Sequence, residues 1–429
     1  MMVEVTVPLT TQSDISKEIN KNYKHNFVVN FLATTVIWFG ISFIAHSTIL
    51  PVYIAKLTNK EFIIAYLSMI IATGYLLPQL FTANWVQRLP VKKYVPVKVG
   101  FWADRLPVLL FVPGAWLATI SKDLALIVSL VAITWHIIGT GIGAVGWQDM
   151  IAKIFPVENR GKFAGISNFS GTISGILGAI AATLLLDRFP FPYGFMWSFL
   201  VGGISIMIAW FFLSMTKEPA LLQTVPNQTN QKYFGKLIEI LRRDQNLRSF
   251  LITQIFSGGR SMAFGFYAVY AFKHWNLVES QAGTFTLAML IGQAPSNLLL
   301  GWIADKKGHK LNLEICAIVT ALSLGIAAFT TSETWFYLVF ILMGISSAGI
   351  IISGQMFIYE FCTPEIRPTY IGINNTFNGI VAMIMPLFGG LLINLFGYQA
   401  MFLVAFIICV IGFFLLKHWV HEPRQSTNH

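Results

Sequence analysis

The chain has 429 residues, of which 55% are hydrophobic and only 11% are charged, and its formal net charge is +10. Soluble domains carry about 25% charged residues, so this balance excludes a water-soluble protein and predicts one that crosses a lipid bilayer many times. The positive charge does not indicate a nucleic-acid partner, because its carriers lie at the ends of apolar runs, beside an anionic leaflet.

Apolar runs predict an all-α membrane protein with twelve spans, at about 20 residues per crossing. The first six are expected at residues 28–54, 62–83, 97–119, 124–147, 163–186 and 193–214. The second six are expected at residues 250–272, 282–303, 311–331, 335–358, 370–396 and 399–419. Residues 1–25 and 421–429 are then polar tails, and the first has no apolar core of a cleavable signal peptide.

Lysine and arginine residues gather in alternate loops, and positively charged loops stay cytoplasmic. The loops expected on the cytoplasmic side hold Arg88, Lys92, Lys93, Lys98, Lys153, Arg160, Lys162, Lys306, Lys307 and Lys310. The opposite loops hold only Lys56, Lys60, Lys122, Arg188 and Lys273. Both termini are therefore expected in the cytoplasm, with the chain in the plasma membrane.

A polar linker at residues 215–248 divides the spans six and six. Within it Phe234, Leu237, Ile238 and Leu241 recur at helical spacing, which predicts an interfacial helix on the cytoplasmic leaflet. The expected domains are thus two six-helix bundles, residues 26–214 and 249–420.

The two halves resemble each other in sequence. Residues 52–56 (VYIAK) correspond to residues 269–273 (VYAFK), and residues 148–168 correspond to residues 355–375. Repeated halves predict a two-lobed transporter with its site between the lobes.

The turn at residues 301–310, GWIADKKGHK, joins two apolar runs and carries a lysine cluster that cannot enter hydrocarbon. It resembles the loop signature G-x-x-x-D-x-x-G-x-[KR] between helices eight and nine of the major facilitator superfamily. The resemblance implies two pseudo-symmetric bundles that rock about a central site, with spans one, four, seven and ten lining the cavity. It also implies a cytoplasmic gate, with Asp305 accepting hydrogen bonds from a helix end of the other lobe.

Charged and titratable residues inside spans are costly, so they are the candidates for solute or proton contact: His46, Asp104, Arg105, His136 and Arg260. Asp104 and Arg105 point about 100° apart on an α-helix and need not pair. They either hold span three to its lobe or take part in coupling. Arg260 either binds an anionic solute or forms an intramembrane ion pair, with Asp104 as one partner. His46 and His136 either bind protons or pack through hydrogen bonds.

Two further groups have expected structural roles. The cytoplasmic gate comprises Asp305 with Glu158, Arg160, Lys306, Lys310, Glu365 and Arg367, whose exposed ion pairs are weak singly and must act together. Close helix packing in span five is expected at Gly171, Gly175 and Gly178, and the resemblance implies span eight as the partner helix.

The sequence therefore predicts a monomeric secondary transporter of a small organic solute, driven by protons, with no cofactor. A non-transporting sensor or assembly factor for a membrane complex is the alternative. Neither a nucleotide-binding loop, nor a metal-ligand cluster, nor a nucleophile and base pair is evident, which leaves an intramembrane enzyme as the last hypothesis.

Overall fold

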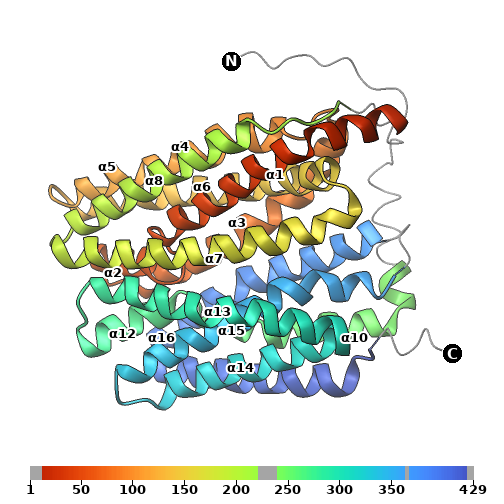
Figure 1. Cartoon of the computed structure of the whole chain (residues 1–429). Helices are drawn as coiled ribbons and strands as arrows, with labels where there is room; N and C mark the ends of the chain where they lie inside the picture. Colours follow the sequence, from red (N-terminus) through yellow and green to blue (C-terminus); the bar gives the residue numbers. More distant parts are fainter. Residues whose placement is uncertain (1–11, 221–238, 363–366, 423–429) are drawn as a thin grey trace. The chain divides into compact units, whose positions relative to one another are not determined.

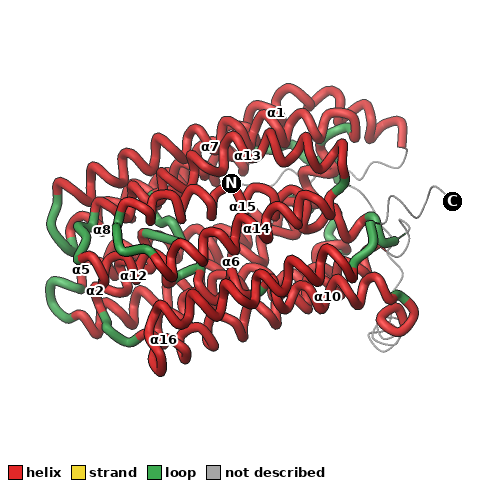
Figure 2. Tube along the Cα trace, turned by 90° about the horizontal axis from the view of Figure 1, so that it is seen from below, coloured by secondary structure: helices red, strands yellow, loops and turns green. Residues whose placement is uncertain are grey.

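A computed structural model describes residues 12–220, 239–362 and 367–422 of the chain. In these ranges the chain forms helices and connecting loops and no strand (Figures 1 and 2). Residues 12–25, expected as a polar tail, are the beginning of the first helix. The predicted interfacial helix lies mostly outside the described residues, and of its predicted apolar positions only Leu241 is described, in a helical segment.

Packing divides the chain into two compact units. Unit 1 comprises Met1–Ile44 and Gly74–Asn227, and unit 2 comprises Ala45–Thr73 and Gln228–His429. The boundary after Asn227 falls within residues 215–248, the predicted polar linker. Residues 45–73, however, belong to the first half in sequence and pack with unit 2.

Unit 1 is built around two long helices, α1 and α7, that lie side by side (Figure 1). Its helices are α1 (Gln12–Ser42), the second half of α3 (Glu61–Gln87), the π-helices η1 (Val95–Val99) and η2 (Phe101–Arg105), α4 (Leu106–Leu109), α5 (Phe111–Leu117), α6 (Lys122–Ile154), α7 (Val157–Arg188) and α8 (Tyr193–Ser214).

Unit 2 contains the first half of α3 and the rest of the helices. These are α2 (Ile49–Leu57), α10 (Gln245–Ser257), α11 (Gly259–Ala263), α12 (Phe266–Trp275), α13 (Ser280–Lys307), α14 (His309–Phe329), α15 (Thr334–Tyr359) and α16 (Arg367–Trp419).

Among the described residues, nine helices are long and apolar enough to cross a membrane. The difference from the twelve predicted spans has local causes. The third and seventh predicted spans are interrupted helices, formed by η1 to α5 and by α10 to α12. The eleventh and twelfth run together in α16, which is broken at Gly397, where φ is 86°. The twelve crossings themselves stay a prediction.

The glycine face of α7 packs against α1. A Cβ at Gly171 would lie 2.6 Å from Trp38 Cδ1, and one at Gly178 would lie 2.5 Å from the Phe39 carbonyl oxygen. Ser42 donates its hydroxyl to the Gly175 carbonyl at 2.8 Å. Within unit 1 these glycines pack against α1. The packing of span five against span eight, which the family resemblance implies, stays a prediction.

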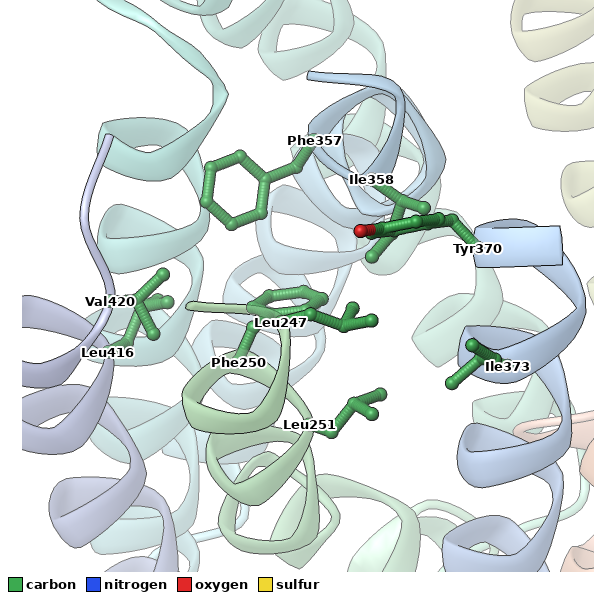
Figure 3. Close-up of a cluster of buried hydrophobic side chains, with 9 residues drawn as sticks. All are labelled: Leu247, Phe250, Leu251, Phe357, Ile358, Tyr370, Ile373, Leu416 and Val420. Carbon is green, nitrogen blue, oxygen red and sulfur yellow. The ribbon is translucent and has the colours of Figure 1, made fainter. Parts of the chain in front are cut away.

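A cluster of buried apolar side chains joins the start of α10 to the C-terminal end of α15 and to both ends of α16 (Figure 3). Phe250 and Phe357 meet edge to face with ring centroids 5.0 Å apart. Asp244 caps α10 by accepting the Leu247 N–H at 2.8 Å, and it also accepts the Tyr370 hydroxyl at 2.8 Å. This cap and cluster fix the helix that leads to Arg260.

Candidate functional site

Three of the predicted site residues meet in unit 1 around Asp104, which is 4% exposed. Arg105 Nη1 lies 3.0 Å from Asp104 Oδ2, and His136 Nδ1 lies 2.8 Å from Asp104 Oδ1. Thr140 donates its hydroxyl to the same Oδ1 at 3.1 Å. Thr140 was not predicted from sequence, although it lies one helical turn after His136 and therefore on the same face of α6.

Asp104 and Arg105 pair directly because of the local backbone. Both belong to η2, and a π-helix has a wider turn than an α-helix, so neighbouring side chains diverge less than the sequence argument assumed. Such π-turns are frequent at functional sites. The result is a buried carboxylate held between a permanent cation and an imidazole.

Gly139 allows α6 to approach η2 closely enough for these contacts. A Cβ at Gly139 would overlap the Ala103 carbonyl oxygen, so no side chain fits at this position without a shift of the backbone. Gly139→Ala must therefore move α6 away from η2 and draw His136 and Thr140 away from Asp104. We expect a loss of about 1–3 kcal/mol in stability, measured as a lower midpoint of thermal unfolding of the purified protein.

Gly143→Ala is the matched control. Gly143 lies on the same helix, and a Cβ there would meet no neighbouring atom within 4 Å. Alanine favours a helix over glycine, so this variant should be at least as stable as the parent. Equal unfolding midpoints for the two variants would contradict the close approach at Gly139.

Arg260 lies in unit 2 on a short segment of an interrupted helix. The chain runs from α10 through α11 to α12, with Gly258 and Gly265 at the two interruptions. These glycines sit under close neighbours, because a Cβ at Gly258 would overlap Val381 Cγ1 and one at Gly265 would overlap Ser68 Oγ. Interrupted helices are typical of substrate sites in membrane transporters.

The Arg260 side chain is exposed to a cavity of about 320 Å³ within unit 2. Hydroxyl groups make up most of its polar lining. They belong to Ser68, Ser261, Tyr267, Thr320, Ser323, Ser346 and Ser347, and the apolar walls are Ile71, Ala72, Phe264, Met343, Ile350 and Ile351. Some of these hydroxyls are hydrogen-bonded to one another; Thr320 Oγ1 and Ser346 Oγ, for example, lie 2.6 Å apart.

No carboxylate of the described part of unit 2 forms an ion pair with Arg260. The ion pairs found there involve other cations, as in Lys56 with Glu279 and Lys310 with Glu314. Asp104, the partner suggested from sequence, is already engaged by Arg105 and His136 in unit 1.

A larger groove of about 600 Å³ lies in unit 1 along η1 and η2. Its walls are mainly aromatic and aliphatic, including Trp102, Trp135 and Trp210, and among the described lining residues only Lys98 is charged. The Arg260 cavity offers a solute many more hydrogen-bonding groups and is therefore the better candidate site. Across the described residues, no group of three His, Cys, Asp or Glu side chains is arranged to hold a metal ion.

The other predicted site residues lie apart from this cavity. His46 is in the turn between α1 and α2. Asp305 is exposed near the end of α13, and Lys306 Nζ lies 4.6 Å from the centre of the Trp302 ring. Lys310 donates to the Lys417 carbonyl at 3.0 Å.

Of the remaining gate residues, Arg160 caps α6 by donating to the carbonyls of Phe155, at 3.1 Å, and Ala152. Glu365 and the side chains of Glu158 and Arg367 lie outside the described parts of the chain. Their predicted ion pairs between bundles stay a prediction.

Sequence reasoning missed a group of buried hydrogen bonds, here called a clamp, that ties the residues after α8 to other parts of unit 1. Glu218 accepts the backbone N–H groups of Lys92 and Lys93 at 2.9 and 2.6 Å, and the Lys153 ammonium at 2.7 Å. Asn26 and Lys217 exchange two hydrogen bonds of 2.8 Å. Burial lowers the pKa of Lys93, and the nearby Glu218 carboxylate opposes that shift.

Unit 2 contains a matching clamp after α16. Asn246 and His421 exchange hydrogen bonds of 3.1 and 2.8 Å, as Asn26 and Lys217 do in unit 1. Glu422 lies against the loop at Gly308, where a Cβ would be 2.6 Å from Glu422 Oε2 and φ is 98°. A repeated signal was present in the sequence: a Glu-Pro pair follows both the sixth and the twelfth predicted span, at residues 218–219 and 422–423.

Long apolar helices, an interrupted helix and a polar cavity between helices define a multi-pass membrane protein of the solute-transporter class. The sequence matches the family model of the Major Facilitator Superfamily over residues 30–272 and 249–429. The chain belongs to this superfamily, as the turn at residues 301–310 indicated. It is accordingly a transporter and not an enzyme.

Individual relatives are distant. The chain is 24% identical over 308 residues to the cis,cis-muconate transport protein of Acinetobacter baylyi, covering 67% of this chain and 72% of that protein. It is 24% identical over 168 residues to the benzoate transport protein of the same organism, covering 38% of this chain and 36% of that protein. The solved nucleoside transporter NupG superposes with a TM-score of 0.65 at 14% identity, over 91% of this chain and 98% of that one. This last likeness shows the fold alone.

Proposed function

We propose that this protein is a proton-coupled transporter of small organic anions that works by alternating access in the plasma membrane. The observation that carries the proposal is Arg260, a cation exposed to a polar cavity and not paired with any carboxylate in the described part of unit 2. An unpaired charge inside a membrane protein is costly, so its retention favours a partner that arrives from outside the protein.

The chemistry of the cavity supports a carboxylate solute. A guanidinium donates two parallel hydrogen bonds to a carboxylate, and surrounding hydroxyls can donate to its remaining lone pairs. A volume of about 320 Å³ suits a molecule with one ring or a short chain. The names of two relatives, transport proteins for muconate and benzoate, are consistent with this substrate class.

The cluster in unit 1 supports proton coupling. Asp104 can bind a proton when Arg105 turns away and release it when the ion pair reforms, and His136 offers a second proton site within 2.8 Å. Protonation of a buried carboxylate is a common coupling device in membrane transporters. His46 lies in a helix break outside both sites, and its proton role has less support.

The cytoplasmic gate is proposed for the turn that contains Asp305. Its acidic side chain suits the positive end of a helix in the other lobe, and this contact would break when the cytoplasmic side opens. With both termini in the cytoplasm, the lysines at Lys306 and Lys310 face the anionic leaflet. The proposed functional unit is a monomer, with protons and the solute as its ligands.

Purified protein in proteoliposomes tests this function. Radiolabelled benzoate, a neutral analogue such as benzamide and a cationic analogue such as benzylamine should be compared at two external pH values. We expect the carboxylate to be taken up or to compete best, with faster flux when a pH gradient is imposed. Binding of a carboxylate without any flux would instead favour the sensor alternative, and preference for the cation would refute the anion site.

A further inference from the structure

Two lysine–glutamate pairs at one end of unit 2 connect the two sequence repeats in a reciprocal way. Lys56 and Lys273 occupy equivalent places in the repeated segments 52–56 and 269–273. Each is followed, five or six residues later, by a glutamate at the start of the next helix, Glu61 or Glu279. Neither lysine is seen paired with the glutamate of its own repeat.

The pairs cross from one repeat to the other. Lys56 Nζ donates to Glu279 Oε1 at 2.5 Å, and Lys273 Nζ donates to Glu61 Oε1. Glu61 also accepts the Tyr398 hydroxyl at 2.6 Å through its other oxygen. The Glu61 side chain is 12% exposed and the Glu279 side chain 25%. The pair of Lys273 with Glu61 is therefore better shielded from solvent than the pair of Lys56 with Glu279.

Local helix ends stabilise each of the four charges. Lys56 and Lys273 lie in the last turns of α2 and α12, where a helix favours cations. Glu61 lies in the first turn of α3 and Glu279 immediately precedes α13, and the start of a helix favours anions. Each charge therefore remains stabilised when its partner leaves, so the pairs can separate and reform.

The same segment that carries Lys56 and Glu61 also lines the Arg260 cavity. Ser68 is seven residues after Glu61 on α3, about 10 Å along the helix, and it is a cavity residue. Two further contacts tie this segment to the second repeat: the hydroxyls of Thr48 and Thr286 share a hydrogen bond, and Ser68 Oγ lies against Gly265. Movement of this segment would open the cavity at this end.

We infer that the two pairs form a reciprocal charge latch that closes the non-cytoplasmic entrance of the Arg260 cavity. The sidedness of the latch rests on the proposed function, which assigns the loops of Lys56 and Lys273 to the side opposite the termini. Release of both arms admits solute from that side. Because its ions are partly exposed, salt screens the latch and keeps it reversible.

The test measures access to Ser68 without any substrate. Ser68→Cys is introduced into a C316A/C362A/C409A background, and its labelling by a membrane-impermeant maleimide is timed in intact cells. Charge reversal in one arm, K273E or E61K, should speed labelling by about fivefold, and K56E or E279K should have a smaller effect. Variants are compared only when their expression and thermal midpoint match the parent.

The deciding comparison uses two double variants with the same net charge. K273E/E61K exchanges charges across the repeats and should return labelling to the parent rate. K56E/E61K exchanges them within one repeat, places like charges together in both arms, and should label fastest. Equal rates for these two variants would overturn the latch. Because labelling requires no transport, absence of flux in proteoliposomes would leave this result standing and would count against the proposed function alone.

Discussion

Arg260→Ala should lower uptake of an organic carboxylate by about 100-fold, because removing one partner of a buried charge pair costs several kcal/mol. The defect should appear in binding as well as in flux, since the guanidinium is the cation of the cavity. Uptake by Arg260→Lys should lie between that of the parent and that of Arg260→Ala, because an ammonium keeps the charge but lacks the planar, two-pronged guanidinium. Initial uptake rates and equilibrium binding in proteoliposomes measure both effects.

Arg248→Ala provides the matched control for this experiment. Arg248 lies on α10, on the same interrupted helix, and is not among the side chains that line the Arg260 cavity. It should transport as the parent protein does. If Arg260→Ala also transports normally, Arg260 does not bind the solute and the anion proposal fails.

Asp104→Asn should abolish accumulation against a gradient while exchange of labelled for unlabelled solute continues. Asparagine has nearly the shape of aspartate but cannot bind and release a proton, so it uncouples the proton from the solute. We expect concentrative uptake to fall at least about tenfold, since proton sites in membrane transporters are functional by default. Counterflow and pH-gradient-driven uptake, measured side by side, separate the two steps.

Thr140→Val is the control for Asp104→Asn, because it removes a hydrogen bond to Asp104 and keeps the carboxylate. It should retain accumulation and shift only its pH dependence. Thermal midpoints must be recorded for both, since Asp104→Asn leaves Arg105 without its ion-pair partner in a buried site. Accumulation by Asp104→Asn at the parent level would remove Asp104 from coupling.

Much of the fold follows from the chain taken alone. Apolar runs of about 20 residues require helices, since only a helix satisfies its own backbone groups in lipid. Two breaks escaped prediction because they depend on neighbours. The π-helical turns at η1 and η2, and the interruptions around Arg260, do not change the apolar pattern that the prediction used.

The candidate residues were found from sequence because a charge in hydrocarbon is rare and visible. Their partners were not. Helical geometry predicted that Asp104 and Arg105 need not pair, yet η2 brings them together, and Gly139 admits His136 and Thr140 to the same carboxylate. The roles of Glu218 and Glu422 were not predicted because both lie outside the predicted spans, where charged residues are common.

By itself, then, the sequence determined the membrane class, the repeated halves, the superfamily and a short set of intramembrane charges, because composition and helical period act locally along the chain. Only the tertiary structure decided which charges are paired and which are exposed to a cavity, since that depends on the local backbone and on side chains from other parts of the chain. Lys56 with Glu279 and Lys273 with Glu61 illustrate the difference. Each lysine has a glutamate nearby in its own repeat, and folding pairs it with the other.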